Sequence, residues 1–445
     1  MFKKLKRSAL GAGVPHEKVT AGMATVTMPV PSKLVLPMSQ HIGAPCQPVV
    51  KKGDTVHVGS LVGQAGGFVS ANIYSGVSGT VAGIETVTYP TGQRVQAVVI
   101  TPDGAQTPDP GIQPPVVTDK ASFIKAVQAC GLVGLGGAGF PAAVKLSPAT
   151  KVDTLVINGA ECEPYLTPDT REFLECSETV MSGIEAVMKY LEIPNCIIGI
   201  ERNKPECIDL MASLVQGTKG VSVKPLPSRY PQGAEKNLIE NTTGREVPEM
   251  VYGEKPRPGL PADVGVIVMN VTSVSTIGKF LKTGMPLISK RVTVDGDAAA
   301  KPQNVEALIG TPLEEIIDFA GGVKEGVTLG KVLCGGPMMG TAMADLTFPL
   351  LKQNNGLLLF SKEKADLPEP GPCIRCGRCI NGCPMGLAPV QIAGAYNRRD
   401  LDELNKLNLG LCVLCGTCTF VCPAKRPVTQ TMSLAKAFQR TGGKK

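Results

Sequence analysis

Eight cysteines near the carboxyl end constrain the fold of this chain more than any other feature of the sequence. They form two runs with the same spacing, C-x2-C-x2-C-x3-C, and a proline follows the last cysteine of each run. The two-residue gaps let one loop wrap a metal cluster, and the final Cys-Pro turns the chain away toward a helix. The runs are Cys373, Cys376, Cys379 and Cys383, followed by Cys412, Cys415, Cys418 and Cys422.

This spacing is typical of bacterial ferredoxins with two [4Fe–4S] clusters, in which the last cysteine of each run binds the other cluster. Gly377 and Gly416 stand where the wrapping loops most need backbone freedom. The alternative is a pair of zinc sites, but zinc motifs usually separate two pairs of cysteines, whereas three cysteines in seven residues crowd one ion. Two clusters in one small module predict an electron relay. The expected ligand sets are Cys373, Cys376, Cys379 and Cys422 for one cluster, and Cys412, Cys415, Cys418 and Cys383 for the other.

The length of the chain, 445 residues, predicts three or four domains. Its 43% hydrophobic and 19% charged residues are typical of a globular protein with large cores. No run of about 18 uncharged apolar residues occurs, so no segment is expected to span a bilayer. The stretch "MFKKLKRSAL" is basic but lacks the apolar core of a secretory signal, so we expect a cytoplasmic protein. Cytoplasmic thiols stay reduced, which favours metal binding over disulfides for the fifteen cysteines.

The charge pattern narrows the range of partners. The chain has a formal net charge of +7, no Trp and 4% aromatic residues, and no basic stripe alternates with stacking side chains, so nucleic acid is not an expected partner. Its last stretch, "AKRPVTQTMSLAKAFQRTGGKK", carries six Lys or Arg and no acid. We favour a solvated basic tail, and the alternative is docking to an acidic protein surface or to an anionic membrane face.

A glycine-rich stretch, "GLVGLGGAGFPAAVKL", contains G-x-G-x-x-G at Gly134, Gly136 and Gly139. In dinucleotide-binding folds this motif follows a strand. Here the preceding "DKASFIKAVQACG" has apolar residues at helical spacing, which excludes an ordinary Rossmann turn. Backbone N–H groups of such a loop can still close on a phosphate or a flat ring, with Lys145 as a nearby cation. The alternative is a plain tight turn.

An acidic loop follows the next apolar stretch. The sequence "TLVINGAECEPYLTPD" predicts a strand from Thr154 to Ile157. Ligands of open α/β sheets gather at the carboxyl ends of strands. Asn158, Glu161 and Glu163 are therefore candidates for contacts to a cofactor ring or sugar chain, and the alternative is that the glutamates are merely solvated.

The remaining cysteines and the histidines show no ligand pattern. None of the three histidines, His16, His41 and His57, lies beside the glycine loop or the cysteine runs, so a His-based acid or metal site is not expected. The other cysteines are expected to be buried as small hydrophobic residues. These are Cys46, Cys130, Cys162, Cys176, Cys196, Cys207 and Cys334.

The fold class predicted for the chain is a multidomain α/β protein. Short β-rich pieces at 31–112 look like a barrel-sandwich module of the biotinyl and lipoyl type, although "GGFVSANIYSG" lacks the modifiable lysine of such carriers, so we expect a docking scaffold. Apolar strands alternate with helical stretches from Thr118 to about Met285, which predicts an α/β sheet. Then a strand, a turn at Asp295-Gly296 and a helix with Thr311 as cap and Pro312 as first residue are expected.

The motifs G-x-G-G-A-G-F-P and I-N-G-A-E-C-E-P, with Lys145 between them, resemble the flavin- and NADH-binding subunit of respiratory complex I. Together with the cysteine runs and the amino-terminal module, the chain is more similar to the RnfC family of Rnf complexes. These are membrane-bound, ion-pumping ferredoxin:NAD+ oxidoreductases. The resemblance covers about residues 30 to 425, and it implies a β-grasp domain of the soluble-ligand-binding type after the flavin domain. The expected organisation is an N-terminal extension (1–30), the barrel-sandwich module (31–112), a complex-I-flavoprotein-like FMN/NADH domain (113–285), the β-grasp domain (286–350), a linker (351–372), a bacterial ferredoxin-like two-cluster domain (373–430) and a basic tail (431–445).

The resemblance implies an FMN held by the glycine loop, with nicotinamide stacked over it and Glu163 in contact with the dinucleotide. Further contacts carry over from "YPQGAEKNL" and "VIVMNVTS". Two positions depart from the complex I pattern, because Ala160 and Ala234 stand where the relative has acids. The implied FMN contacts are Gly134, Gly136, Lys145, Asn158, Glu161, Tyr230, Gly233, Glu235 and Asn270, and the nicotinamide contacts are Gly137, Ala138 and Phe140.

The implied activity is electron transfer between the two clusters, FMN and NAD(H). FMN would convert single electrons into a hydride, and no side chain needs to act as a catalyst. The resemblance implies a peripheral protein on the cytoplasmic face of the bacterial membrane, with the membrane-embedded and the ferredoxin-accepting iron–sulfur Rnf subunits as partners. The alternatives are a soluble NADH-dependent reductase of the cobalamin-reductase type and a non-catalytic relay protein without flavin.

Overall fold

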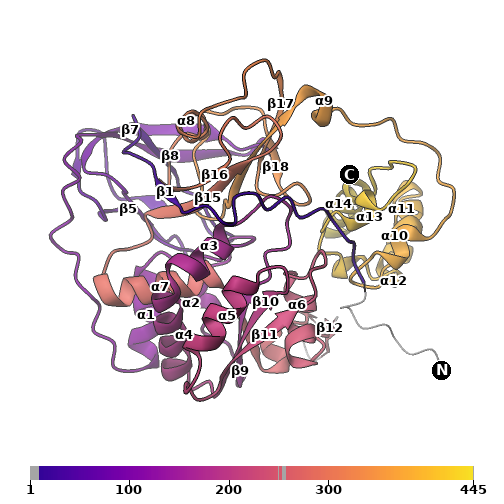
Figure 1. Cartoon of the computed structure of the whole chain (residues 1–445), viewed down its shortest axis with the longest axis horizontal. Coiled ribbons are helices and arrows are strands. Elements are labelled where there is room, and N and C mark those ends of the chain that lie inside the picture. The colour runs from indigo at the N-terminus through magenta and orange to yellow at the C-terminus, as the bar shows by residue number, and fades with distance from the viewer. Residues whose placement is uncertain (1–9, 249, 253–256, 444–445) are drawn as a thin grey trace.

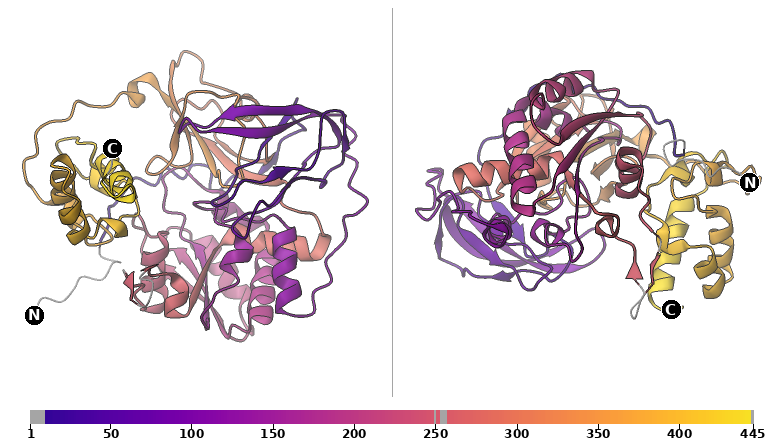
Figure 2. Two further views of the ribbon diagram at one scale, coloured as in Figure 1. Left: turned by 180° about the vertical axis from the view of Figure 1, so that it is seen from behind. Right: turned by 90° about the horizontal axis from the view of Figure 1, so that it is seen from below.

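A computed structural model describes residues 10–248, 250–252 and 257–443. The β-rich module, the α/β domain and a mixed sheet pack against one another (Figure 1). A small helical domain at the carboxyl end lies to one side, after a long connecting segment (Figure 2). No helix in the described part of the chain is long and apolar enough to cross a membrane.

The β-rich module consists of two small sheets, as the sequence predicts. One sheet has the order β2-β8-β7-β4 and the other has the order β3-β5-β6. The long strands β7 and β8 pair over most of their length, and residues such as Val81, Val98 and Ile100 are buried in the core of the module. The bounds are β2 (Leu34–Pro37), β3 (Gln47–Pro48), β4 (Thr55–Val56), β5 (Leu61–Gln64), β6 (Ile73–Tyr74), β7 (Gly79–Thr88) and β8 (Arg94–Pro102).

The α/β domain contains a parallel sheet of order β11-β10-β9-β14. The strands β9 to β11 follow one another in one direction, whereas β14 joins β9 on its other side. The winding therefore reverses between β9 and β14, which is where open α/β sheets bind their ligands. The bounds are β9 (Thr154–Gly159), β10 (Asn195–Glu201), β11 (Val221–Leu226) and β14 (Val266–Asn270), with a separate hairpin of β12 (Met250–Val251) and β13 (Arg257–Pro258).

Helices cover this sheet. The helix α1 precedes the glycine loop, as predicted, and Asp119 caps it by accepting the backbone N–H of Ser122. The helices α4 and α7 pack closely because Gly183 and Gly278 lie against backbone carbonyls, where a Cβ would come within 2.0 and 2.3 Å of oxygen. The bounds are α1 (Lys120–Ala129), α2 (Ala142–Lys145), α3 (Pro168–Glu175), α4 (Ser177–Leu191), α5 (Pro205–Leu214), α6 (Glu235–Thr243), the 3-10 helix η2 (Pro261–Val264) and α7 (Val271–Thr283).

A six-stranded mixed sheet of order β1-β16-β15-β19-β17-β18 follows the α/β domain. The linker predicted at 351–372 is wrong for residues 356–365, because β19 lies inside this sheet and α9 follows it directly. The predicted start of α8 is also wrong: Pro312 is the cap residue and the Thr311 hydroxyl donates to the carbonyl of Leu308 instead. The bounds are β1 (Val26–Thr27), β15 (Ser289–Asp295), β16 (Gln303–Leu308), α8 (Leu313–Phe319), β17 (Leu329–Cys334), β18 (Thr341–Met343), β19 (Gly356–Ser361) and α9 (Lys362–Ala365).

The carboxyl-terminal domain contains the two cysteine runs and its own small core. The tail predicted at 431–445 is wrong through Arg440, because α14 buries Met432 and Ala435 in this core. Gly377 and Gly416 have φ values of +74° and +82°, which confirms the expected need for glycine in the wrapping loops. The bounds are α10 (Arg378–Asn381), α11 (Pro389–Asn397), α12 (Leu401–Lys406), the 3-10 helix η3 (Leu409–Leu411), α13 (Thr417–Phe420) and α14 (Val428–Arg440).

Candidate functional site

The site begins at the carboxyl ends of β9 and β14. Asn158 and Asn270 lie at the ends of these neighbouring strands and stand opposite each other in the register of the sheet. The Asn158 Nδ2 donates to the carbonyl of Gly233 at 3.0 Å, which ties the segment before α6 to the same edge. Asn270 caps α7 by accepting the backbone N–H groups of Thr272 and Ser273. The two asparagines therefore organise the edge of the sheet at which the winding reverses.

The glycine loop lies over this edge as a closed turn. The N–H of Gly134 donates to the carbonyl of Phe140 at 2.9 Å, and the residues from Gly136 to Ala138 are exposed. Gly136 rests on Asn270, since a Cβ there would lie 2.6 Å from the Asn270 Nδ2. At Gly137, by contrast, a Cβ would meet no atom within 4 Å. The loop thus presents open backbone on the side away from the protein.

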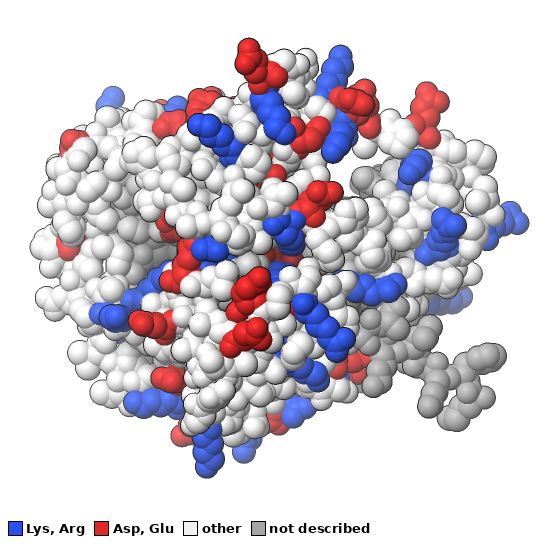
Figure 3. Space-filling view, in the orientation of Figure 1, with Lys and Arg blue, Asp and Glu red and all other residues white. Residues whose placement is uncertain are grey.

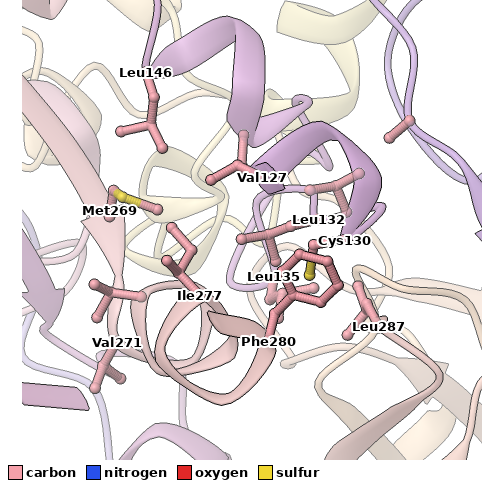
Figure 4. Close-up of a cluster of buried hydrophobic side chains, with 14 of the residues drawn as sticks. Val127, Cys130, Leu132, Leu135, Leu146, Met269, Val271, Ile277, Phe280 and Leu287 are labelled. Carbon is pink, nitrogen blue, oxygen red and sulfur yellow. The ribbon is translucent and has the colours of Figure 1, made fainter. Parts of the chain in front are cut away.

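Apolar packing and two buried lysines fix the base of the loop. Leu132 and Leu135 turn toward Ile277 and Phe280 of α7 in the core (Figure 4). The Lys290 Nζ donates to the carbonyl of Leu135 at 2.7 Å. A second amine, from Lys352, donates to the carbonyl of Gly131 at 2.7 Å and also bonds the carbonyl of Asn72 in the β-rich module. Burial lowers the pKa of each lysine to about 8.

Sequence reasoning missed both lysines. They come from the mixed sheet and its flank, more than 150 positions from the loop, and no motif marks them.

The β-rich module also touches the glycine loop. The N–H of Ile42 donates to the carbonyl of Gly139, and the Gly139 backbone lies beside His41 and Gln353. The expectation that no histidine lies beside this loop is therefore wrong in space, because the fold brings His41 to it. Burial lowers the pKa of His41, and nearby Lys352 lowers it further. Within the described residues, three buried polar atoms here have no hydrogen-bond partner: Gln40 Nε2, His41 Nδ1 and Gln353 Oε1.

A cation and a carboxylate complete the rim. Lys145, on the short helix after the loop, forms an ion pair with Glu235 at 2.7 Å and donates to the carbonyl of Val268. The two side chains are 34% and 40% exposed, so a ligand can reach them. The structure therefore brings Lys145, Glu235, Asn158, Asn270 and the glycine loop together, as predicted from five separate segments.

Asp169 is a further site residue that the sequence did not reveal. Its carboxylate accepts the Asn270 Nδ2 at 2.7 Å and the Thr272 hydroxyl at 2.9 Å, at the start of α7. Burial raises the pKa of Asp169, while the Lys290 amine opposes this shift. The only signal in the sequence is its place after Pro168 in the first turn of α3.

Glu161 is buried behind this edge. Its two carboxylate oxygens accept the backbone N–H of Asp169 at 2.8 Å and the Thr170 hydroxyl at 2.7 Å. Burial raises the pKa of Glu161 to about 7, and the amines of Lys18 and Lys204 oppose the shift. Lys18, from the amino-terminal segment, donates to the backbone carbonyls of Glu161 and Glu163. In this structure Glu161 positions α3, which carries Asp169.

Glu163 and Tyr230 lie where three domains meet. The Glu163 Oε2 accepts the N–H of Met338 in the mixed-sheet domain at 3.0 Å. The Tyr230 hydroxyl donates to the carbonyl of Cys415, in the second cysteine run, at 2.7 Å. Tyr230 is 1% exposed and packs with Ala12, and the half-buried Met338 and Cys415 border it. Both residues thus face the cluster-type domain, and their predicted contacts to FMN and the dinucleotide remain predictions.

The structure brings the cysteines together across the two runs. One enclosed cavity with mostly apolar walls is lined by Cys412, Cys415, Cys418 and Cys383, the set expected for one cluster. Burial raises the pKa of Cys418 to about 12, and the neighbouring thiols Cys415, Cys412 and Cys383 add to the shift. In the other set, burial raises the pKa of Cys379, with the thiols of Cys373 and Cys422 close enough to contribute.

These residues fit the groups that the sequence predicts. Four thiols around a dry cavity suit a [4Fe–4S] cluster, which is held by Cys thiolates. Exposed glycine backbone, a cation and unpaired buried polar atoms at a sheet reversal suit a phosphorylated ring cofactor. Of the remaining cysteines, Cys46, Cys130, Cys196, Cys207 and Cys334 are buried, as expected, and Cys162 and Cys176 are partly exposed.

Models of four protein families match the chain in the order of its domains. They are described as the RnfC barrel sandwich hybrid domain at residues 7–105, the Nuo51 FMN-binding domain at 127–279, the SLBB domain at 291–342 and the 4Fe-4S dicluster domain at 372–426. Among solved structures, an NAD+-reducing [NiFe]-hydrogenase chain is similar, with a TM-score of 0.47 and 19% identity over 74% of this chain and 63% of that chain.

Curated relatives match over almost the whole length. The RnfC-type component of the proton-translocating ferredoxin:NAD(+) oxidoreductase complex of Clostridium ljungdahlii is 42% identical and aligns over 96% of this chain and 93% of its own. Its counterpart in the Na(+)-translocating complex of Acetobacterium woodii is also 42% identical, over 91% and 90%. The counterpart in the ion-translocating oxidoreductase complex of Rhodobacter capsulatus is 37% identical, over 98% and 84%. The chain therefore belongs to the RnfC family of the ion-translocating ferredoxin:NAD(+) oxidoreductase complexes.

Proposed function

We propose that this chain is the NAD(H)-reacting subunit of an ion-translocating ferredoxin:NAD+ oxidoreductase complex and relays electrons between two [4Fe–4S] clusters, FMN and NAD(H). One observation carries the proposal. The four-thiol cavity and the glycine-loop site belong to one chain, and Tyr230 joins the cysteine run directly to the domain with the glycine loop. An electron held at that cavity therefore has a flavin-type site as its neighbour within the same protein.

The residues of the chain would hold and shield the cofactors. A bound FMN supplies the conversion between single electrons and a hydride. The exposed N–H groups from Gly136 to Ala138 and the Lys145 amine would bind its anionic and electron-rich groups. Asn158 and Asn270 would fix its position over the sheet edge, while Phe140 and Ala138 are placed to border the nicotinamide. The apolar walls of the four-cysteine cavity keep water from one cluster.

The complex to which this chain belongs would provide the partners. Relatives are named as subunits of proton- and Na(+)-translocating complexes. We place this chain at the cytoplasmic face of the bacterial membrane, bound to membrane-embedded subunits that move the ion and to the iron–sulfur subunit that accepts electrons from ferredoxin. The names of the relatives favour this assignment over a soluble cobalamin-reductase-type enzyme and over a flavin-free relay.

The proposal is tested on anaerobically purified full-length chain. We expect about eight iron atoms per chain, bound FMN and NADH:dye reductase activity. Lys145→Met should lower flavin retention at least about tenfold, because a charge-assisted contact is worth roughly 1.5–3 kcal/mol. Lys125→Met, an exposed lysine on α1, is the matched control and should change nothing. Protein that holds iron but neither flavin nor NADH:dye activity would show that the chain is a relay alone.

A further inference from the structure

The two cysteine loops have the same backbone conformation but different surroundings. In each loop the residue before the second cysteine has a left-handed φ, +55° at Arg375 and +54° at Leu414, and the glycine after that cysteine has a φ of +74° or +82°. The loops are therefore local copies of one structure. Any difference in what they contact reflects their different places in the molecule.

The second loop is covered by the rest of the chain. The carbonyl of Cys415 accepts the Tyr230 hydroxyl, and Gly416 lies so close to Met338 that a Cβ would be 2.7 Å from its carbonyl oxygen. Val413 and Leu414 are half-buried. This loop is the inner contact through which one cluster site meets the flavin-type site.

The first loop is bare at the equivalent positions. A Cβ at Gly377 would meet no atom within 4 Å, and Cys373 and Cys376 are exposed. Ile374 is 66% exposed, and the nearby Phe420 is 47% exposed. Exposed apolar side chains beside a redox site, on a loop whose copy is covered by a protein domain, indicate a missing protein partner.

Basic side chains surround this bare loop. From residue 370 to the end, the chain has eleven Lys or Arg and three Asp or Glu, although the whole chain has a net charge of only +7. Arg375, Arg378 and Lys425 are exposed, and none of them takes part in the ion pairs formed among the described residues. An open groove beside the loop is lined by Arg229, Arg378, Lys425, Phe420 and Cys422.

The charge is visible on the surface. In Figure 3 the domain that contains α10 to α14 shows Lys and Arg side chains and few carboxylates, whereas the remaining surface mixes both signs. A one-signed rim attracts a partner of opposite charge and speeds its encounter.

We propose that the first cysteine loop, from Cys373 to Arg378, forms with Phe420 and Lys425 a docking face for an acidic electron-carrying protein. The inference rests on the proposed function and adds the place and chemistry of the outer contact. One electron leaves the cofactor of the partner and enters the cluster of Cys373, Cys376, Cys379 and Cys422, or moves in reverse. The apolar side chains form the centre of the contact and the basic ones form its rim, as in weak and transient redox complexes.

A protein partner explains the surface better than a membrane does. The exposed apolar residues flank the exposed thiols Cys373 and Cys376 and form no continuous apolar helix face. Electron exchange requires a cofactor on the other side of the contact, which a lipid surface does not supply.

The test uses the full-length holoprotein and a reduced, acidic two-cluster ferredoxin as the probe. Arg375→Glu, Arg378→Glu and Lys425→Glu together should slow reduction of the clusters by the probe at least about tenfold and abolish the salt dependence of the rate. Lys51→Glu, Lys52→Glu and Lys219→Glu make the same change of charge on exposed lysines elsewhere and should leave the rate within about twofold. Iron content and the EPR spectra of dithionite-reduced protein check that the clusters remain.

Three results would overturn the docking face. The first is an equal effect of both triple variants. The second is a change in midpoint potential with unchanged affinity for the probe by surface plasmon resonance, because the charges would then only tune the cluster. The third is loss of binding to phosphatidylglycerol vesicles with unchanged reduction by ferredoxin, which would assign the face to the membrane.

If the reversal variant loses iron, Arg375→Gln, Arg378→Gln and Lys425→Gln replace it, with a smaller expected loss of rate. The readout does not require flavin. A chain that reacts with the probe in this charge-dependent way but not with NADH would sink the proposed function and keep the docking face.

Discussion

Asp295 ends β15 with one carboxylate oxygen paired and the other buried without a partner. The Oδ1 accepts the N–H of Gly296 at 2.7 Å, and the Oδ2 has no hydrogen-bond partner among the described residues. Burial raises the pKa of Asp295 to about 6, so the folded chain keeps this proton to higher pH than the unfolded chain does. The free energy of unfolding therefore falls as pH rises from about 4 to about 6 and stays lower above that range.

We expect Asp295→Asn to stabilise the mixed-sheet domain by roughly 2 kcal/mol at pH 7 to 8, because the amide keeps the acceptor for Gly296 and removes the buried charge. The gain should fall by about half at pH 5, where the wild-type carboxyl is mostly protonated in the folded state. Calorimetric unfolding at both pH values measures it. Asp318→Asn, at an exposed carboxylate in the same domain, should change stability by less than about 0.5 kcal/mol. A gain that is the same at pH 5 and pH 8 would contradict the raised pKa.

At this scale the sequence predicted the residues that meet at the candidate site but not what supports them. Gly136, Lys145, Asn158, Glu235 and Asn270 are marked by motifs or by their place at strand ends, and the fold brings them together. The supporting side chains, Lys290, Lys352 and His41, come from other domains. Their contacts depend on how whole domains pack, and no local pattern in the sequence contains that information.

At the scale of elements, α14 shows how composition can hide a helix. The six Lys or Arg between residue 424 and the end suggested a solvated tail. The apolar residues Val428, Met432, Ala435 and Phe438 recur at helical spacing, and this stripe packs on α11 and α12. The periodicity was available in the sequence. Net charge describes the exposed face of a helix, whereas the apolar stripe decides whether it is buried.

We expect Met432→Ala to destabilise the carboxyl-terminal domain by about 2–5 kcal/mol, since Met432 is 1% exposed and its loss leaves a cavity beside the second set of cysteines. Because cluster binding and folding are coupled, iron should be released to a chelator at least about tenfold faster. Leu434→Ala is the matched control on the same helix, at a side chain 56% exposed, and should release iron at the wild-type rate. Equal rates for both variants would show that α14 does not support the cluster site.

At the scale of the whole molecule, the amino-terminal segment and the mixed sheet join domains that the sequence presents separately. Lys18 bonds carbonyls of the acidic loop after β9, and β1 adds an edge strand to the mixed sheet. Lys352 ties the β-rich module to the glycine loop through Asn72 and Gly131. The motifs predicted the kinds of domain in the right order. The contacts between domains arise from single side chains and short bridges, which carry no signature.

The contact between Tyr230 and Cys415 is the most direct of these links, and its removal tests the path of electrons through the molecule. We expect Tyr230→Phe to keep iron and flavin, because the ring still fills the buried space and only one hydrogen bond, worth about 0.5–1.5 kcal/mol, is lost. The cysteine loop should then sit less firmly on the flavin-type domain. In stopped-flow experiments with NADH, flavin reduction should stay at the wild-type rate while cluster reduction slows several-fold. Tyr252→Phe, at a side chain 84% exposed, is the control for loss of a tyrosine hydroxyl. Unchanged cluster reduction in Tyr230→Phe would mean that electrons reach the clusters by another contact, and a change in flavin reduction alone would place Tyr230 at the flavin, where the resemblance to complex I first put it.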